Sequence, residues 1–409
     1  MYSLKNAIRL FSQLLALLLL LFQTPLTGSA QKSETPVTAS ELQFASGQSA
    51  RRIPFEFVGN HIYLRARVNN SEPLWFLLDS GATASYLGVQ QAKALKVADQ
   101  ENSVKGVSIS LPGARLLNQD FSLRPLGFDP YDGHAIDGMF GYDFINRFVI
   151  EIDYVNRTVN LYDPKNYKYS GFGDIIPLIM LEDDSGGKVP LVRVKIMQRG
   201  RAPIEGKLIA DLAVRAGITF NTPFVEANKL LQPTQKTIQA VLGAGAMVRE
   251  SKQPIGRLPN IQLGCFTIQN PVAIFFQDKQ GVMASPEFDG LIGSEILRRF
   301  KVIFDYSRQQ MILEPNGYFT EAYEHDMTGM LLISEGTGFR VKQVMENSPA
   351  SEAGLRDGDF ITVFSGRRAP SLKLEHLRLM FMRAGRSYRL SVKRGDENIR
   401  TRIRLRRLI

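Results

Sequence analysis

The chain has 409 residues, of which 44% are hydrophobic and 22% are charged, and it carries a formal net charge of +10. The length corresponds to roughly two to three domains, and these ordinary proportions exclude a mostly disordered or low-complexity protein. A single cysteine, Cys265, excludes an internal disulfide framework and a cysteine-built zinc site, and four scattered histidines without an HExxH motif argue against a metal-dependent peptidase. We therefore expect neither a metal nor an organic cofactor.

The N-terminal residues have the pattern of a secretory signal. Two positive charges, Lys5 and Arg9, precede an apolar run at 10–22, and small residues follow it. The run is shorter than the ~20 apolar residues that a spanning helix needs. We therefore predict a signal peptide at 1–30, export to the periplasm or the medium, and a flexible linker at 31–50. The alternative is an uncleaved anchor, which would hold the protein at a membrane.

The chain then contains an internal repeat, in which the same sequence patterns occur twice in the same order. An alternating strand at 61–68 leads to an apolar run that ends in Asp79, and a similar strand at 189–196 leads to Asp211. Further matches follow in the same order, namely 136–141 with 288–293, and 149–154 with 302–306. The period-2 alternation predicts strands. The fold class is therefore mostly β, with two similar lobes at 51–172 and 173–318 that are related by a pseudo-twofold axis.

Each repeat places an aspartate where a predicted strand ends. Asp79 follows five apolar residues and precedes Ser80-Gly81, where glycine permits a tight turn. An Asp-Ser-Gly triplet alone is often a plain turn. Its duplication as Asp211 suggests two carboxylates that face each other and share a proton. In such a pair one carboxylate takes a proton from water while the other protonates a carbonyl oxygen.

These motifs resemble those of the two-lobe pepsin/retropepsin-type aspartic proteases, over residues 53–315. Residues 77–82 resemble the catalytic loop of that family, and Met139-Phe140-Gly141 and Leu291-Ile292-Gly293 resemble the strand behind each loop. The resemblance implies that Asp79 and Asp211 form a catalytic dyad with a water held between them. It also implies that Ser80 and Gly81 support the first catalytic loop.

The second loop departs from the family pattern. Leu212 and Ala213 stand where the family has Ser or Thr followed by Gly. Leu212 has no hydroxyl to brace the two loops, and Ala213 carries a β-carbon where glycine eases the turn. This departure is the main support for the alternative that the protein is a catalytically degenerate protease scaffold that binds peptides. A third hypothesis, activity of lobe 1 through dimerisation, is disfavoured by the covalent second lobe, and we expect a monomer.

The C-terminal part of the chain, 327–409, has a different pattern. Ser348-Pro349 predicts a capped helix start, and Gly354 predicts its end. The series Ser348-Pro349-Ala350, Ala353-Gly354-Leu355 and Gly358-Asp359 resembles a PDZ domain. That resemblance implies a peptide-binding loop formed by Gly329, Met330, Leu331 and Leu332, which would hold the terminal carboxylate of a peptide added as a strand. The alternative is a groove that is empty or filled by segments of this chain.

The remaining features carry less functional information. The resemblance implies a flap at 103–121, between Asp79 and Gly141. His134 and Asp137 are candidate cleft residues that we interpret as structural turn residues, and we interpret Trp75 as core packing. Five arginines alternate with apolar residues near the C-terminus, namely Arg400, Arg402, Arg404, Arg406 and Arg407. We interpret them as a solvated strand face, and we expect no nucleic-acid partner.

The sequence therefore predicts an exported aspartic endopeptidase with a C-terminal PDZ domain. Its partners would be a peptide or protein substrate at the dyad and a peptide terminus in the PDZ groove.

Overall fold

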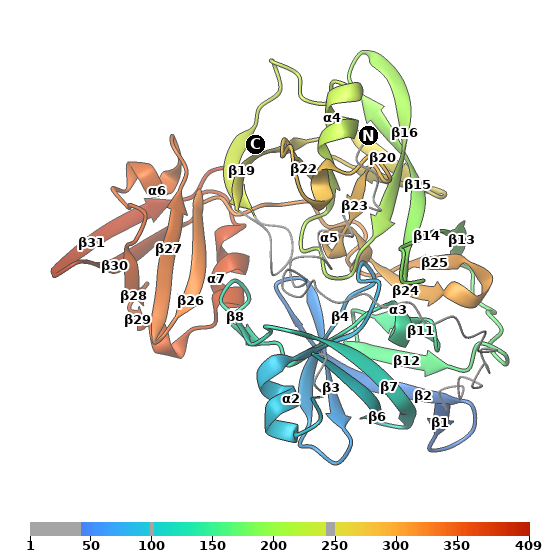
Figure 1. The fold of residues 1–409 in the computed structure, drawn as a ribbon. Coiled ribbons are helices and arrows are strands. Elements are labelled where there is room, and N and C mark those ends of the chain that lie inside the picture. Colours follow the sequence, from blue (N-terminus) through green and yellow to red (C-terminus); the bar gives the residue numbers. More distant parts are fainter. Residues whose placement is uncertain (1–41, 99–101, 243–249) are drawn as a thin grey trace, which may run out of the picture.

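The computed structural model describes residues 42–98, 102–242 and 250–409 (Figure 1). Strands dominate these residues, and the helices are short. The predicted signal peptide, 1–30, lies outside the described residues, as does most of the predicted linker. No helix in the described part of the chain is long and apolar enough to span a membrane.

Lobe 1 comprises the elements of the first repeat together with two earlier strands, β1 and β2. They are β1 (Leu42–Phe44), β2 (Ser49–Val58), β3 (His61–Val68), β4 (Leu74–Leu78), β5 (Tyr86–Gly88), α2 (Val89–Leu95), β6 (Ser103–Leu111), β7 (Ala114–Arg124), β8 (Phe128–Asp129), β9 (His134–Ala135), β10 (Gly138–Phe140), α3 (Tyr142–Ile145), β11 (Val149–Asp153) and β12 (Thr158–Tyr162).

The predicted flexible linker at 31–50 is wrong over its last residues. β1 pairs antiparallel with β7, and β2 begins at Ser49 and pairs with β12. The Phe44 ring contacts the Phe148 ring edge-on, at 6.3 Å between centroids. Burial of these apolar side chains favours strand pairing despite the polar composition of the segment.

Lobe 2 comprises the elements of the second repeat. They are β13 (Asp174–Pro177), β14 (Ile179–Glu182), β15 (Lys188–Gln198), β16 (Arg201–Ala210), β17 (Ile218–Phe220), α4 (Thr222–Ala227), β18 (Ile238–Leu242), β19 (Ser251–Arg257), β20 (Asn260–Leu263), β21 (Phe266–Gln269), β22 (Val272–Phe275), η1 (Val282–Ala284), β23 (Gly290–Ile292), α5 (Ser294–Leu297), β24 (Phe300–Asp305), η2 (Tyr306–Arg308) and β25 (Gln310–Pro315).

The two lobes share a sheet. A 13-stranded sheet holds most strands of lobe 1 and also β13, β24 and β25 of lobe 2, whereas the other strands of lobe 2 form a 10-stranded sheet. The junction is the antiparallel pair β11–β24, in which Ile150 is opposite Phe304. These two strands are equivalent in the repeat, so their pairing is the structural counterpart of the predicted pseudo-twofold axis. Buried side chains of both lobes form one continuous apolar cluster.

The same local topology occurs in both lobes at the point where each aspartate lies. In lobe 1, β10 lies between β4 and β5, parallel to β4 and antiparallel to β5. In lobe 2, β23 lies between β16 and β17 in the same two orientations. β4 ends directly before Asp79 and β16 ends directly before Asp211. Each aspartate therefore begins a loop held by a parallel neighbouring strand.

The C-terminal domain has its own sheet and its own core. Its elements are β26 (Met330–Glu335), β27 (Gly338–Val344), α6 (Pro349–Glu352), β28 (Phe360–Phe364), β29 (Arg367–Arg368), η3 (Ala369–Ser371), α7 (Leu374–Phe381), β30 (Ser387–Arg394) and β31 (Glu397–Arg404). Ser348 caps α6 by accepting a bond from the Ser351 amide at 3.2 Å, and Pro349 occupies the first turn. In Figure 1 this domain lies beside both lobes, with α7 next to β8.

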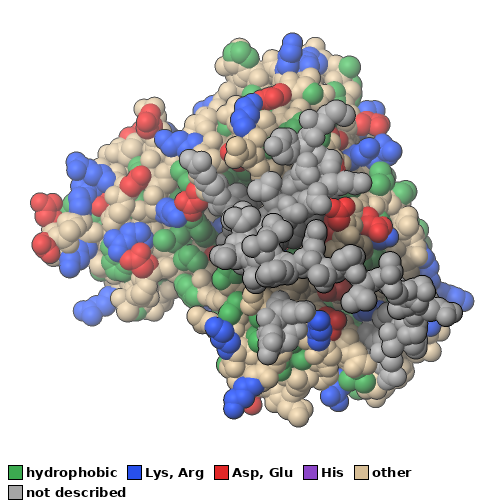
Figure 2. Space-filling model, viewed as in Figure 1, with side chains coloured by type: hydrophobic (Ala, Val, Ile, Leu, Met, Phe, Trp, Pro, Cys, Tyr) green, Lys and Arg blue, Asp and Glu red, His purple; other side chains and the backbone are tan. Residues whose placement is uncertain are grey.

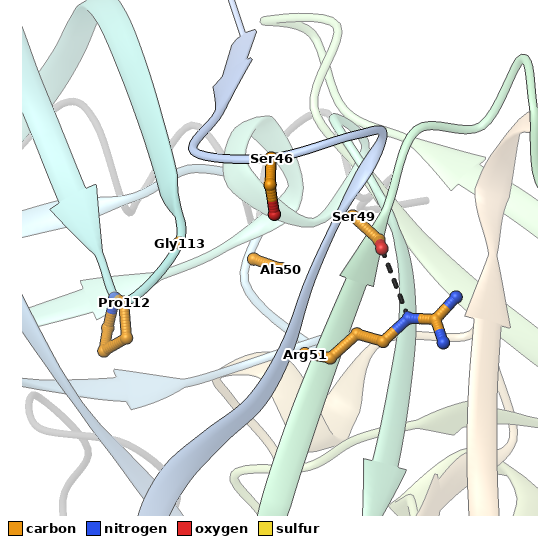
Figure 3. Close-up of a pocket in the computed structure, with 6 residues that line it drawn as sticks. All are labelled: Ser46, Ser49, Ala50, Arg51, Pro112 and Gly113. Atoms are coloured by element: carbon orange, nitrogen blue, oxygen red, sulfur yellow. Dashed lines mark hydrogen bonds between the residues drawn. The ribbon is translucent and has the colours of Figure 1, made fainter.

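The predicted flap segment forms the hairpin β6–β7. Its Pro112-Gly113 turn lies against Ala50 and lines a cavity of about 550 Å³ together with Ser46, Ser49 and Arg51 (Figure 3). Within this cavity Arg51 Nε donates to Ser49 Oγ at 3.2 Å. The turn of the hairpin therefore packs against the beginning of β2.

Candidate active site

The structure places Asp79 and Asp211 in matching surroundings. The Asp79 amide donates to Phe140 O at 2.9 Å, and the Asp211 amide donates to Ile292 O at 2.9 Å. Each carboxylate accepts a bond from the amide two residues later, from Gly81 at 2.9 Å and from Ala213 at 2.8 Å. Both loops therefore hold their aspartates in the same way.

The two carboxyl groups lie close enough to affect each other's ionisation. Burial raises the pKa of Asp79, and the charge of Asp211 raises it further. Burial also raises the pKa of Asp211. Because like charges this close resist simultaneous ionisation, the pair retains one proton more readily than isolated carboxyls do. Glycine at position 81 allows the two loops to approach this closely, since a β-carbon there would collide with the Asp211 carboxylate.

Ser80 connects the two loops. Its side chain is buried, and its Oγ donates to Ala210 O at 2.7 Å and accepts from the Leu212 amide at 3.0 Å. The hydroxyl therefore joins the lobe 1 loop to the residues on both sides of Asp211. Ser80 and Gly81 thus both lie at the contact between the loops.

Leu212 makes no reciprocal side-chain bond. Its side chain is buried and apolar, so it has no group that could donate to the lobe 1 loop. Its carbonyl instead accepts a bond from Ser294 Oγ at 2.9 Å, within lobe 2. The side-chain hydrogen bonds between the two loops therefore come from Ser80 of lobe 1 and not from Leu212 of lobe 2.

Two tyrosines near the pair were missed by the sequence reasoning. Burial raises the pKa of Tyr86, and the nearby charge of Asp79 acts in the same direction, while the Arg124 guanidinium lies 4.6 Å from the ring centroid. Tyr306 is buried, and both aspartates raise its pKa well above the usual value in addition to burial. The pattern that identified the aspartates gave no signal for either tyrosine.

A polar cluster around Asp132 was also missed. The Asp132 side chain is 0% exposed, His61 Nδ1 lies 2.6 Å from its Oδ2, and the Tyr63 hydroxyl donates to the same oxygen at 2.7 Å. Arg215, in the loop after Asp211, binds the other oxygen. In the sequence, Asp132-Gly133 has the pattern of an ordinary turn.

The donor atoms of this cluster do not suit a metal ion. His61, Asp129 and Asp132 offer ligand atoms within 4.8 Å of one another. However, Arg215 binds Asp132 Oδ1, and Arg378 Nη1 lies 3.7 Å from the same atom. The two guanidinium groups already supply the positive charge that a cation would provide.

The predicted cleft residues have structural contacts. His134 stacks on Tyr63 at 4.0 Å between ring centroids. Asp137 accepts from the Trp75 amide at 2.8 Å and from Gln91 Nε2 at 2.7 Å. Trp75 itself is half-buried, under the Arg65 guanidinium at 4.5 Å. None of these contacts involves Asp79 or Asp211.

The predicted peptide-binding loop begins β26, which forms one edge of the C-terminal sheet. Gly329 has φ +70°, and a β-carbon there would collide with Ser348, so the loop requires glycine. The Met330 amide donates to Thr328 Oγ1 at 3.1 Å, and Met330, Leu331 and Leu332 all pair with β27.

The edge of β26 is already in contact with lobe 1. The Ser334 amide donates to Pro130 O at 2.7 Å. From α7, Arg378 Nη2 donates to Leu332 O at 3.4 Å. The turn between β8 and β9 therefore occupies part of the edge to which a peptide strand would add.

The C-terminal arginines lie mostly in solvent. Arg400, Arg402 and Arg404 of β31 are exposed, and lysine and arginine side chains are spread over this domain at the left of Figure 2. Arg406 pairs with Glu352 at 2.8 Å, between exposed side chains.

Comparison with solved structures and curated proteins gave limited similarity. An aspartic proteinase from Irpex lacteus is similar in fold at 10% sequence identity with a TM-score of 0.42, over 67% of this chain and 99% of that chain. No curated protein matched the sequence. The family model of the PDZ domain matches residues 321–405, which include every strand of the C-terminal sheet. Residues 321–405 of the chain are therefore a PDZ domain.

Proposed function

We propose that the protein is an exported aspartic endopeptidase that hydrolyses peptide bonds with Asp79 and Asp211. The observation that carries the proposal is a pair of neighbouring carboxyls, Asp211 buried and Asp79 half-buried, held by the same backbone bonds in two matching loops. Such a pair supplies both halves of general acid–base catalysis at one point. The expectation of export rests on the signal pattern of residues 1–30.

In the proposed mechanism the pair binds one water and carries one proton. The ionised carboxylate takes a proton from the water, whose oxygen attacks the peptide carbonyl carbon. The protonated carboxyl gives its proton to the carbonyl oxygen, so that a neutral tetrahedral diol forms. The C–N bond then breaks as the amide nitrogen receives a proton from the pair and one diol hydroxyl returns its proton. The products are a carboxylic acid and an amine, and the pair again holds one proton.

The PDZ domain has a proposed role in binding peptide termini or regulating access to the dyad. PDZ domains bind an extended peptide as an additional strand on a sheet edge. This role suits a protease that acts on peptides or unfolded proteins.

The alternative is a catalytically degenerate scaffold that binds peptides without cleaving them. It is favoured by the apolar side chain of Leu212, which leaves the loops braced from one side. Since a small misplacement of a catalytic group costs about 100-fold in rate, a loose second loop could abolish useful activity.

Digestion of an unfolded protein tests the proposal. Residues 31–409 would be incubated with casein from about pH 3 to 8, a range that spans carboxyl titration and neutrality. Asp79→Asn and Asp211→Asn would be compared with Asp184→Asn, which changes an exposed aspartate. We expect fragments, detected by mass spectrometry, from the wild type and the control but from neither dyad variant.

Two results would decide for the alternatives. Fragments lost only in Asp79→Asn would mean that Asp211 is not catalytic. If the wild type gave no fragments and also failed to bind a statine-containing peptide, which mimics the transition state at such a pair, the peptide-binding alternative would be favoured.

A further inference from the structure

We propose that Asp132 is a positioning residue that holds the second catalytic loop against lobe 1 and so replaces the brace that Leu212 cannot make. This inference rests on the proposed dyad mechanism. Asp132 touches neither the water nor the substrate in that mechanism. It acts through Arg215, four residues after Asp211.

Arg215 fixes the second catalytic loop to lobe 1 at three points. Its Nε donates to Gly59 O at 2.9 Å, and its own carbonyl accepts from Asn60 Nδ2 at 3.0 Å. Its Nη2 binds Asp132 Oδ1. Gly59 and Asn60 form the turn between β2 and β3, so all three partners belong to lobe 1. The loop that lacks a hydroxyl is thus held from the other lobe by a charged side chain.

Asp132 is itself held rigidly, as a positioning group must be. Its side chain is fully buried, with bonds from His61, Tyr63 and Arg215. Although burial works to raise the pKa of Asp132, the Arg215 charge and the bonds from His61 and Tyr63 keep it well below its usual range. Gly59, at φ +59°, leaves the space for this carboxylate, because a β-carbon there would collide with it. The carboxylate is therefore ionised and has little freedom to move.

The cluster also reaches the dyad electrostatically. Burial raises the pKa of Asp211, whereas the bond from the Ala213 amide and the nearby His61 imidazole act to lower it. His61 is oriented by its 2.6 Å contact with Asp132. Asp132 therefore fixes both Arg215, in the Asp211 loop, and His61.

The position in the first loop that is equivalent to Arg215 is held differently. Thr83, four residues after Asp79, contacts Asp183 in the turn between β14 and β15 of lobe 2. Each loop is therefore held by a turn of the opposite lobe, but only the second loop is held through an ion pair, in which the carboxylate is fully buried. The stronger link lies on the loop whose internal brace is missing.

Kinetics on the predicted mature protein, residues 31–409, test this role. The substrate would be a peptide selected from the casein fragments, with Asp132→Asn as the main variant. We expect kcat to fall about 10- to 100-fold with little change in KM, because the variant misplaces a catalytic group and leaves substrate binding intact. Arg215→Lys keeps the positive charge and should lose less activity than Arg215→Ala.

The matched control is Asp359→Asn in the PDZ domain. Asp359 is also 0% exposed and pairs with Arg394 at 2.7 Å, far along the chain from either loop. The control should lower the unfolding temperature as Asp132→Asn does, yet leave kcat unchanged. Equal losses of stability with unequal kcat would separate positioning from general destabilisation.

A rescue experiment addresses the replaced brace. Leu212→Thr introduces the hydroxyl that the second loop lacks. Combined with Asp132→Asn, it should recover part of the lost kcat. Combined with the control Asp359→Asn, it should not restore the lost stability. The amides of residues 212–216 should exchange hydrogen faster in Asp132→Asn and not in Asp359→Asn.

The outcomes distinguish the two proposals. Unchanged kcat and unchanged exchange in Asp132→Asn would overturn the role of Asp132 while the loss of activity in Asp79→Asn upheld the dyad. If Asp79→Asn kept full activity, the dyad proposal would fail. Hydrogen exchange at 212–216 would then still show whether Asp132 holds the loop. Unchanged exchange in Asp132→Asn would overturn the positioning role of Asp132 too.

Discussion

Ser80 and Leu212 follow the two aspartates at equivalent positions, yet only one of them bonds across the lobes through its side chain. Ser80 Oγ is both donor and acceptor between the loops. Leu212 contributes apolar volume to the core instead. A single hydroxyl therefore carries the direct side-chain link between the two aspartate loops.

Replacing Ser80 by alanine should weaken both folding and catalysis. The Leu212 amide and the Ala210 carbonyl would each lose a buried partner, at a cost of about 1–3 kcal/mol for each group. We expect a lower unfolding temperature and a lower kcat, measured by thermal unfolding and peptide hydrolysis. The control is Ser371→Ala, which removes a local bond to Arg368 O between exposed residues. Equal unfolding temperatures in the two variants would contradict this account of the link.

The pH dependence follows from the raised pKa values of the pair. Activity requires one proton on the two carboxyls, so it falls in acid when both are protonated and falls again when both are ionised. Since burial raises the pKa of Asp79 and of Asp211, the loss at high pH should come well above the pKa of about 4 of an exposed carboxyl. The measurement is kcat/KM against pH. A rate that rose steadily to about pH 8 would contradict a shared proton.

At the scale of the elements, local patterns predicted where the two aspartate loops lie along the chain. The apolar run of β4 and the turn after Asp79 are contiguous in the sequence, and the repeat then located Asp211. Pairing of β11 with β24 could be expected only from the repeat, because strands about 150 positions apart give no local signal of contact. The Asp132 cluster was not predicted, since His61, Asp132 and Arg215 come from three separate segments.

The start of α6 gives a prediction for the PDZ domain. Ser348 is fully buried, and its Oγ accepts from the Ser351 amide and donates to Met345 O at 2.6 Å. Ser348→Ala should lower the free energy of unfolding by about 0.5–2 kcal/mol through loss of the cap. Denaturant unfolding measures this, with Ser387→Ala, at an exposed strand position, as control. A change no larger than that of the control would mean that the cap does not stabilise the domain.

At the scale of the whole molecule, the PDZ domain contacts both lobes. Its Ser334 binds Pro130 of lobe 1, and its Gln343 accepts from the Val241 amide of lobe 2 at 2.7 Å. Lys342 pairs with Glu250 at 2.7 Å, and Glu250 also accepts from the Tyr131 hydroxyl. The edge of β26 is therefore engaged within the chain, and an added peptide strand must compete with the β8–β9 turn.

Loosening that turn should increase peptide binding. Tyr131→Phe removes the bond to Glu250, so the fraction of molecules with a free β26 edge should rise and the apparent Kd should fall by a few-fold. Fluorescence titration with peptides that have a free or an amidated C-terminus measures this. Tyr169→Phe removes a similar bond to Glu314, 2.8 Å long, away from the PDZ domain, and should leave the Kd unchanged. Tighter binding in both variants would contradict competition by the turn.

The β11–β24 pair joins the two halves within one chain, which allows the two loops to differ in sequence. In an assembly of two identical subunits, every substitution appears twice, and dilution separates the halves. Here the halves are joined by a shared sheet within one polypeptide, so the carboxyl pair forms independently of protein concentration. Each half can also change alone. Ser80 and Leu212 illustrate that freedom, because one loop keeps its hydroxyl while the other has an apolar side chain in the same place.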